Sequence, residues 1–341
     1  MKLRTHISFT RVQRSPITIH LSPITFFLLA ILFSCNGPNG IPEPTDTPTS
    51  GDVNIVVDES YSMLFDTELY TFQSLYKNAH VHAKFLPEDQ SLQALMTDSA
   101  KVAVINRPLN AEEKKQFEAR NLFPIETKIA EDAIAFVVNN ENPDTNFSPA
   151  QLKEIMAGTD STWKQINPKS LLNGIRIIFD NPSSANARYI STFSQSQHLP
   201  ATAFAVKSNP EVIEYVNKHK NALGVVSVNW ISDRDDSISR GFLKKIKVIG
   251  FSKPDTTGFS KPDSIKFSKP GTDEKYYKPY QAYIKTKEYP FCRDVYMINR
   301  QTRAGLGMGF VSFVAGDQGQ RIILKMGLIP AIAPTRLVEI H

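Results

Sequence analysis

The sequence predicts an α/β protein with mostly parallel sheets. Short β-branched or apolar runs alternate with helical patterns along most of the chain, and this order is typical of parallel sheets covered by helices. In addition, 41% of the 341 residues are apolar. This is enough for one large domain or two medium-sized ones with a buried core.

The predicted elements follow one another from residue 53. Residues 63–79 carry apolar side chains at helical spacing, whereas residues 80–86 alternate like a half-buried strand. Asn110 precedes two glutamates and Pro149 lies in a first helical turn, and both patterns indicate a helix start. Strands are expected at 53–58, 80–86, 101–105, 132–139, 174–180 and 289–299, and helices at 63–79, 89–96, 110–121, 148–158 and 308–325.

The charge distribution argues against a nucleic-acid partner. The net charge is +5, but the first 35 residues hold four basic residues and no acid. The remainder therefore carries 39 − 4 = 35 basic and 34 acidic residues, a net charge of +1. Binding to a phosphate backbone needs concentrated positive charge, and no compact Lys/Arg run interleaved with aromatic residues occurs.

The N-terminus has the pattern of an export signal. The four basic residues precede an apolar run over 24–33, about half of the ~20 residues that span a bilayer. The run ends in Leu-Phe-Ser-Cys, which resembles a bacterial lipobox with Cys35 as the lipidated residue. We therefore expect a lipoprotein signal peptide at 1–35 and a Pro/Gly/Thr-rich tether at 36–51. The alternative is a signal peptide followed by an unrelated cysteine.

No catalytic, cofactor or metal site is expected. After Cys35, only Cys292 remains, and a lone cysteine in an apolar run is most often a small buried hydrophobic residue. His80 and His82 share one face of a predicted strand, but the sequence locates no third metal ligand. The order of Ser, His and Asp residues indicates no nucleophile, so we do not expect an enzyme.

A short repeat lies within 250–271, where Phe-Ser-Lys-Pro begins at residues 251, 259 and 267. A period of eight residues with a proline in each copy is too short for a solenoid unit. We therefore expect a surface loop inserted between two elements, the alternative being a lysine-rich docking loop.

Residues 177–190 combine features for and against anion binding. An apolar strand runs into a loop of Asp, Asn, Pro and Ser residues, and a helical pattern follows. The first N–H groups of a helix lack intrahelical partners and favour an anion. Asp180, at the start of this loop, would repel one.

Seven segments carry a further pattern: 55–65, 102–113, 132–166, 179–188, 221–230, 289–297 and 310–331. In this order they resemble the PstS-type phosphate-binding proteins of ABC transporters, which have the type II periplasmic binding protein fold. The resemblance is spread over about 52–340.

The resemblance implies two α/β lobes, each a mostly parallel sheet flanked by helices, with the ligand cleft between them. Lobe 1 would comprise 52–131 and 293–341, and lobe 2 would comprise 132–292. It also implies a monomeric, lipid-anchored solute-binding protein of the cell envelope, on the periplasmic or extracellular face. Its ligand would be inorganic phosphate or a related oxyanion, delivered to an ABC permease.

In lobe 1, the resemblance places four residues at the ligand. Ser60 and Ser62 match the Ser and Thr of the family's first loop, although serine also commonly caps a helix. Arg107 matches an arginine of the second loop, and a surface salt bridge is its alternative. Asn106 replaces a serine and keeps hydrogen-bonding ability.

In lobe 2, the candidates are Asp180, Ser183, Ser184, Asn186 and Arg188. Asp180 stands where many members carry a phosphate-binding arginine, and Arg188 is a possible substitute with a surface role as its alternative. Ala185 also departs from the family pattern, because it stands where the family has glycine.

Two acids complicate the phosphate interpretation. Glu59 replaces a family glycine and Asp180 replaces an arginine. At ~4 Å and an effective dielectric constant near 20, each contact with an anion costs about 4 kcal/mol. One carboxylate facing the ligand would accept a hydrogen bond from the proton of phosphate and would exclude sulfate, which has none, so our hypothesis is that one acid faces the ligand and the other points away. The alternative function is a lipid-anchored binding or sensor module with another oxyanion or no small ligand.

Overall fold

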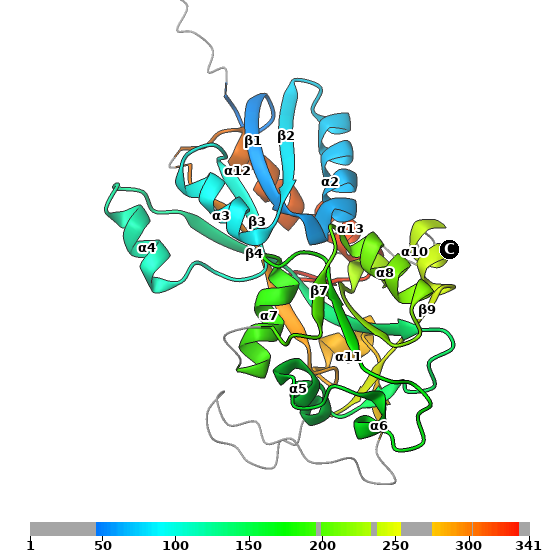
Figure 1. The fold of residues 1–341 in the computed structure, drawn as a ribbon. Helices are drawn as coiled ribbons and strands as arrows, with labels where there is room; N and C mark the ends of the chain where they lie inside the picture. Colours follow the sequence, from blue (N-terminus) through cyan, green and yellow to red (C-terminus); the bar gives the residue numbers. More distant parts are fainter. Residues whose placement is uncertain (1–45, 196–198, 233–236, 254–274, 302, 334–341) are drawn as a thin grey trace, which may run out of the picture. The chain divides into compact units, whose positions relative to one another are not determined.

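The computed structural model describes residues 46–195, 199–232, 237–253, 275–301 and 303–333 (Figure 1). Residues 46–341 form one compact unit, distinct from residues 1–45. The predicted signal peptide, Cys35 and the first part of the predicted tether lie outside the described residues. Among the described residues, no helix combines the length and apolarity needed to cross a membrane.

Strands and helices alternate along this unit. The strands are β1 (Gly51–Asp58), β2 (Ala79–Leu86), β3 (Val102–Ile105), β4 (Ile125–Asn139), β5 (Asn146–Phe147), β6 (Arg176–Phe179), β7 (Ala203–Ala205), β8 (Ala222–Ser227), β9 (Ile246–Val248), β10 (Gly250–Ser252), β11 (Tyr276–Tyr277), β12 (Cys292–Asn299) and β13 (Ile329–Pro330). The helices are η1 (Glu59–Tyr61, a 3-10 turn), α2 (Ser62–Leu75), α3 (Glu88–Met96), α4 (Ala111–Glu118), α5 (Pro149–Ala157), α6 (Trp163–Ile166), α7 (Ala185–Ser194), α8 (Asn209–Lys218), α9 (Asn229–Ser232), α10 (Ser237–Leu243), α11 (Gln281–Lys285), α12 (Leu306–Ala315) and α13 (Asp317–Lys325).

The main sheet has two parallel parts joined by antiparallel strands. Its order is β2-β1-β3-β12-β4-β8-β6-β7, with β9 and β13 paired to β4. β1 pairs in parallel with β2 and β3, and β6 pairs in parallel with β7 and β8. The predicted α/β class is confirmed.

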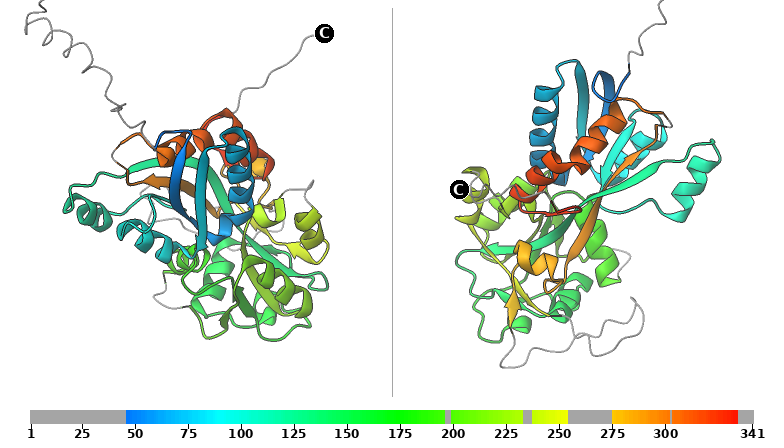
Figure 2. Two further views of the ribbon diagram at one scale, coloured as in Figure 1. Left: turned by 90° about the horizontal axis from the view of Figure 1, so that it is seen from above. Right: turned by 180° about the vertical axis from the view of Figure 1, so that it is seen from behind.

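The long strand β4 passes from one part of the sheet to the other. Its first half pairs with β12 and its second half with β8, and β4 and β12 run side by side between the two parts (Figure 2). We use lobe 1 for the part around β1–β3 and lobe 2 for the part around β6–β8. The sequence pattern showed only 132–139 as a strand because residues 125–131 alternate with charged side chains.

Each lobe has its own apolar core. In lobe 1, one core fills the space between the sheet, α2, α12 and α13, and a smaller one lies under α3 and α4. In lobe 2, the core contains a group of aromatic rings around Phe251, including Phe136 and Phe291.

Local signals explain several helix ends. Asn110 and Glu113 form a reciprocal capping box at α4, as do Ser148 and Gln151 at α5. Instead of one helix over 308–325, α12 and α13 meet at Gly316, which has an extended backbone. The turn is tight, because a Cβ at Gly319 would lie 2.4 Å from the Val314 backbone.

The predicted tether ends earlier than residue 51. Thr47 and Ser50 form a β-bridge, and the Asp46 carboxylate accepts a hydrogen bond from the Leu306 N–H at 2.7 Å. Pro48 lies against Gly309, where a Cβ would come 1.8 Å from its carbonyl oxygen. Residues 46–51 therefore belong to the fold, because they contact the start of α12, and the tether prediction is wrong for them.

The predicted insertion at 250–271 begins later than expected. Residues 250–252 form β10, which pairs with β5 and β11, and the Phe251 side chain is fully buried. The first copy of the repeat therefore starts on a core strand, and the loop prediction is wrong for 250–252. Residues 254–274 lie outside the described residues.

Glu68 is a buried acid on α2, and its replacement tests how much an unpartnered carboxyl group costs in the folded state. Its carboxyl group is buried on α2 with no hydrogen-bond partner for either oxygen, and burial raises its pKa to about 9. An unpartnered buried polar group costs about 1–3 kcal/mol.

We expect Glu68→Met to raise the free energy of unfolding by about that amount at pH 7, measured by urea denaturation. The gain should grow towards pH 9, because the unfolded chain ionises above the ordinary pKa of 4.5 whereas the folded wild type keeps this proton up to about pH 9. A decrease in stability would contradict this, and exposed Glu118→Met is the control.

Candidate functional site

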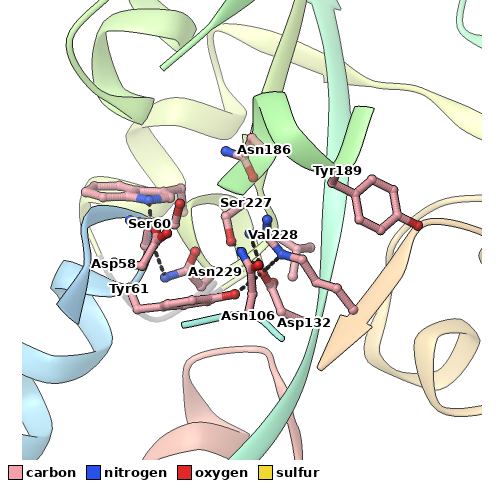
Figure 3. A network of polar contacts seen from close by, with 12 residues as sticks. Asp58, Ser60, Tyr61, Asn106, Asp132, Asn186, Tyr189, Ser227, Val228 and Asn229 are labelled. Carbon is pink, nitrogen blue, oxygen red and sulfur yellow. Dashed lines mark hydrogen bonds and ion pairs between the residues drawn. The ribbon is translucent and has the colours of Figure 1, made fainter. Parts of the chain in front are cut away.

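A network of buried polar side chains joins the two lobes (Figure 3). We call it the interlobe network; its members are Asp58, Ser60, Tyr61, Asn106, Asp132, Asn186, Ser227, Asn229, Trp230 and Arg293, all less than 9% exposed. Most members follow the end of a strand or lie on a strand that connects the lobes. This position at the carboxyl ends of parallel strands is the usual place for a ligand in open α/β sheets.

The centre of the interlobe network is an ion pair between the two connecting strands. Arg293 on β12 places Nε 2.9 Å and Nη2 2.8 Å from Oδ2 of Asp132 on β4. The same oxygen accepts hydrogen bonds from Tyr61 Oη at 3.0 Å and from Ser227 Oγ at 2.8 Å. Asp132 thus links lobe 1, lobe 2 and both connecting strands.

Sequence reasoning missed this pair. Asp132 is the acid directly before the apolar run 133–138, and Arg293 lies in the Tyr-Pro-Phe-Cys-Arg stretch. A single acid before one strand and a single arginine in another were the available signals, and neither shows that the two meet.

Ser60 forms a second contact between the lobes. Its carbonyl oxygen accepts hydrogen bonds from Asn229 Nδ2 at 2.9 Å and from Trp230 Nε1 at 3.0 Å. Its backbone N–H donates to Asp58 Oδ1 at 2.8 Å, which caps the turn η1. Its hydroxyl is buried and has no partner. Ser60 therefore holds the lobes together through its backbone, and its hydroxyl lies close enough to the Asp58 carboxyl to lower the pKa of that acid.

Two acids beside Ser60 have strongly raised pKa values. Complete burial raises the pKa of Asp58 to about 7, although the charge of Arg293 opposes the shift. Partial burial, together with the charges of Asp180 and Asp58, raises the pKa of Glu59 to about 7. Near neutral pH, both acids therefore exchange protons, and each can donate or accept a hydrogen bond.

Asp180 and Asn186 belong to a hydrogen-bonded loop within lobe 2. Oδ1 of Asp180 accepts from the Asn181 N–H at 3.1 Å, and Oδ2 accepts from Asn186 and Asn209 Nδ2, both at 3.0 Å. Burial raises the pKa of Asp180. Its oxygens are occupied by neutral donors, whereas Glu59 Oε1 is buried without a partner.

The remaining residues of that loop take different positions. Ser184 caps α7 by accepting a hydrogen bond from the Ala187 N–H at 3.1 Å. Ser183 is exposed, and both serines line a cavity of about 360 Å³ beside α7. Ser62 is half-buried at the start of α2, a helix that has no side-chain cap.

A chain of ion pairs runs from Arg107 through Glu88 to Arg188. Glu88 on α3 is paired with Arg107 Nε at 3.1 Å and with Arg188 Nε at 2.7 Å. Arg107 also pairs with Glu113, and Arg188 Nη2 donates to Asn106 Oδ1 at 2.6 Å. Both predicted arginines are therefore engaged, and Arg188 links lobe 2 to lobe 1. No sequence pattern indicated this role for Glu88.

Several buried polar atoms in and beside the interlobe network have no partner. The donors are Ser60 Oγ, Asn106 Nδ2 and Arg293 Nη1, and the acceptors are Asp58 Oδ2, Glu59 Oε1, Asp132 Oδ1, Asn186 Oδ1 and Asn229 Oδ1. Such atoms are rare in folded proteins, and each calls for an explanation such as a ligand or ordered water. These atoms are the hydrogen-bonding groups that the interlobe network leaves unused.

Among the described residues, neither Cys292 nor a cluster of metal-ligating side chains forms a reactive centre. Burial raises the pKa of the Cys292 thiol to about 12, so it stays protonated near neutral pH. Within the part of the chain that the structure describes, no group of three His, Cys, Asp or Glu residues is arranged to hold a metal ion.

Fold and site together define a two-lobed binding protein. The chain matches the family model described as "PBP superfamily domain" over residues 42–318 and belongs to that superfamily. This is a binding-protein superfamily, so the predicted resemblance and the expectation of a binding protein rather than an enzyme are confirmed.

Curated relatives are distant. The phosphate-binding protein PstS of Staphylococcus epidermidis is 24% identical over 180 residues, covering 51% of this chain and 52% of the relative. The PstS of Staphylococcus saprophyticus is 24% identical over 222 residues, covering 63% and 60%. The chain thus spans about half the length of the first of these relatives.

Solved structures show the same fold. An ABC-type phosphate transport receptor from Vibrio cholerae superposes with a TM-score of 0.61 at 18% identity, covering 82% of this chain and all of that one. A phosphate-binding protein from Stenotrophomonas maltophilia gives a TM-score of 0.59 at 13% identity, covering 82% and 91%. These similarities confirm the predicted two-lobed binding-protein fold.

Proposed function

We propose that the protein is a lipid-anchored solute-binding protein that captures inorganic phosphate for an ABC permease. The observation that carries the proposal is the set of buried, unpartnered donors Ser60 Oγ, Asn106 Nδ2 and Arg293 Nη1 in the interlobe network. The two curated relatives and the two solved structures compared above are phosphate-binding proteins or phosphate transport receptors by name. Cys35 would be the lipidated residue, and the anchor would hold the protein at the cell envelope.

The acids of the site favour a protonated oxyanion. Asp58 and Glu59 have pKa values of about 7, close to the pH at which phosphate itself changes protonation. A carboxylate can accept the hydrogen bond of a phosphate proton, and a protonated carboxyl can donate to a phosphate oxygen. Sulfate carries no proton at neutral pH, so a free carboxylate would repel it.

In this proposal, Ser60, Asn106 and Arg293 bind the ligand directly. Ser62 and Asn186 lie at helix starts beside them, and we keep both as proposed binding residues. Arg107, Asp180, Ser184 and Arg188 would act through other residues, because their polar groups already have partners within the protein. Ser183, on the exposed side of the loop, would take part only if the lobes moved.

A second candidate function is a binding or sensor module without a small ligand. It is favoured by Glu88, whose carboxylate takes the place of an anion between Arg107 and Arg188. In that case the lobes would stay together without phosphate.

Ser60→Ala tests the first candidate against the second. Loss of a hydrogen bond to a charged ligand costs about 1.5–3 kcal/mol, so we expect phosphate affinity to fall by about tenfold to a hundredfold. The measurement is the phosphate-dependent rise in melting temperature of residues 36–341. Ser74→Ala, on the exposed side of α2, should leave the rise unchanged. An equal phosphate-dependent rise in melting temperature in Ser60→Ala and the wild type would exclude the interlobe network as the phosphate site. No rise in the wild type would favour the second candidate, a module without a small ligand.

A further inference from the structure

A second cavity lies on the far side of the segment that completes the interlobe network. It has a volume of about 650 Å³ and is lined by apolar side chains of α9, α10 and β9, including Val228, Ile231, Leu243 and Val248. This volume lies within the range of about 300–1,000 Å³ that is common for small-molecule sites. These four apolar side chains take no part in the hydrogen bonds of the interlobe network.

The charged residues that line this cavity, among those the structure describes, are all lysines: Lys247, Lys278 and Lys325. The three lysines come from β9, from the segment before α11 and from the end of α13. Lys247 Nζ also donates to the Asn142 carbonyl at 3.2 Å, whereas Lys278 and Lys325 approach from half-buried and exposed positions. Their aliphatic stems can cover apolar surface while the ammonium groups reach an anion at the opening.

The walls of the cavity are fixed by close packing. Gly327 has a positive φ of 85°, and a Cβ there would lie 2.1 Å from Ser232 Cβ. Gln281 Nε2 donates to the carbonyls of Leu324 and Leu328, which ties α11 to the end of α13. The cavity is therefore a feature of the packed fold, formed by elements distant in sequence.

The segment 227–232 separates the cavity from the interlobe network. Ser227, Asn229 and Trp230 make the hydrogen bonds of the network, while Val228 and Ile231 line the cavity. Different residues of this one short segment thus belong to the interlobe network and to the cavity wall.

We propose that this cavity binds a small amphipathic anion, a molecule with an apolar body and one terminal anionic group. The apolar wall would take the body, and Lys278 and Lys325 would pair with the anionic group at the opening. Three lysines among the described lining residues favour an anion over a neutral or cationic molecule of the same shape. The proposal does not depend on the ligand of the interlobe network.

The test uses octanoate as the probe, with 1-octanol and octylammonium as matched neutral and cationic probes of the same chain length. Isothermal titration calorimetry on residues 36–341 should show one octanoate site and binding of the other two probes weaker by about tenfold or more. Lys278→Gln and Lys325→Gln should each weaken octanoate binding by about twofold to fivefold, as expected for partly exposed ion pairs.

Two further variants make the result specific to the cavity. Leu243→Trp would fill the apolar part and should abolish octanoate binding, while exposed Lys244→Gln should leave it unchanged. No octanoate binding, equal binding of octanol, or binding unaffected by Leu243→Trp would overturn the proposal.

Discussion

Replacing Asp132 by alanine is expected to lower the free energy of unfolding by about 3–5 kcal/mol, the cost of leaving a buried charge unpaired. Arg293 is 7% exposed, and its Nε and Nη2 are paired with Asp132 Oδ2. The substitution also removes the acceptor for Tyr61 and Ser227. Urea denaturation at pH 7 measures the change.

Two control variants separate the ion pair from its neighbours. Tyr61→Phe removes one hydrogen bond to Asp132 and should cost about 0.5–1.5 kcal/mol. Asp294→Ala, on the same strand as Arg293 but only partly buried, should cost less than Asp132→Ala. If Asp132→Ala cost no more than these controls, the ion pair would not be the centre of the interlobe network.

The pH dependence of stability is expected to change when Asp58 becomes asparagine. The folded state holds the Asp58 proton up to a pKa of about 7, whereas the ordinary value is 3.8. An acid with a raised folded pKa contributes stability that is fully present below the unfolded pKa and is lost as the pH rises through the folded pKa. Wild-type stability should therefore fall between about pH 4 and pH 7, by up to about 4 kcal/mol from this group.

Asp58→Asn keeps the shape and the acceptor for the Ser60 N–H but cannot ionise. We expect the unfolding free energy of this variant, measured from pH 4 to pH 8, to depend less steeply on pH than that of the wild type. The variant should therefore become more stable relative to the wild type as the pH rises. Exposed Asp89→Asn controls for the substitution itself. Parallel pH profiles of wild type and Asp58→Asn would show that Asp58 does not hold its proton in the folded state.

Much of the fold could be predicted because its elements are local. The capping pairs at α4 and α5 and the apolar runs at β1, β4 and β12 are visible in short windows of sequence. The errors arose where tertiary contacts decide the outcome. Phe251 is a core residue despite its repeat, because the surrounding rings of Phe136 and Phe291 bury it. Residues 46–51 pack because α12 contacts them.

The site was less predictable because its partners are far apart in sequence. Asp132 and Arg293 are separated by 161 residues, and Glu88 and Arg188 by 100. A charged residue in a sequence does not show which opposite charge it meets. Ser60 and Asn106 were identified from the resemblance to the family's first two loops, and both lie in the interlobe network. Asp58, Asp132 and Arg293 were not singled out.

Calorimetric titration of residues 36–341 with phosphate at pH 6, and with sulfate as the control, tests the central claim most directly. The protein should first be stripped of bound phosphate by dialysis. We expect one phosphate per chain, loss of affinity in Ser60→Ala and no heat with sulfate. Absence of phosphate binding, or equal binding of sulfate, would contradict the assignment of the interlobe network as a phosphate site.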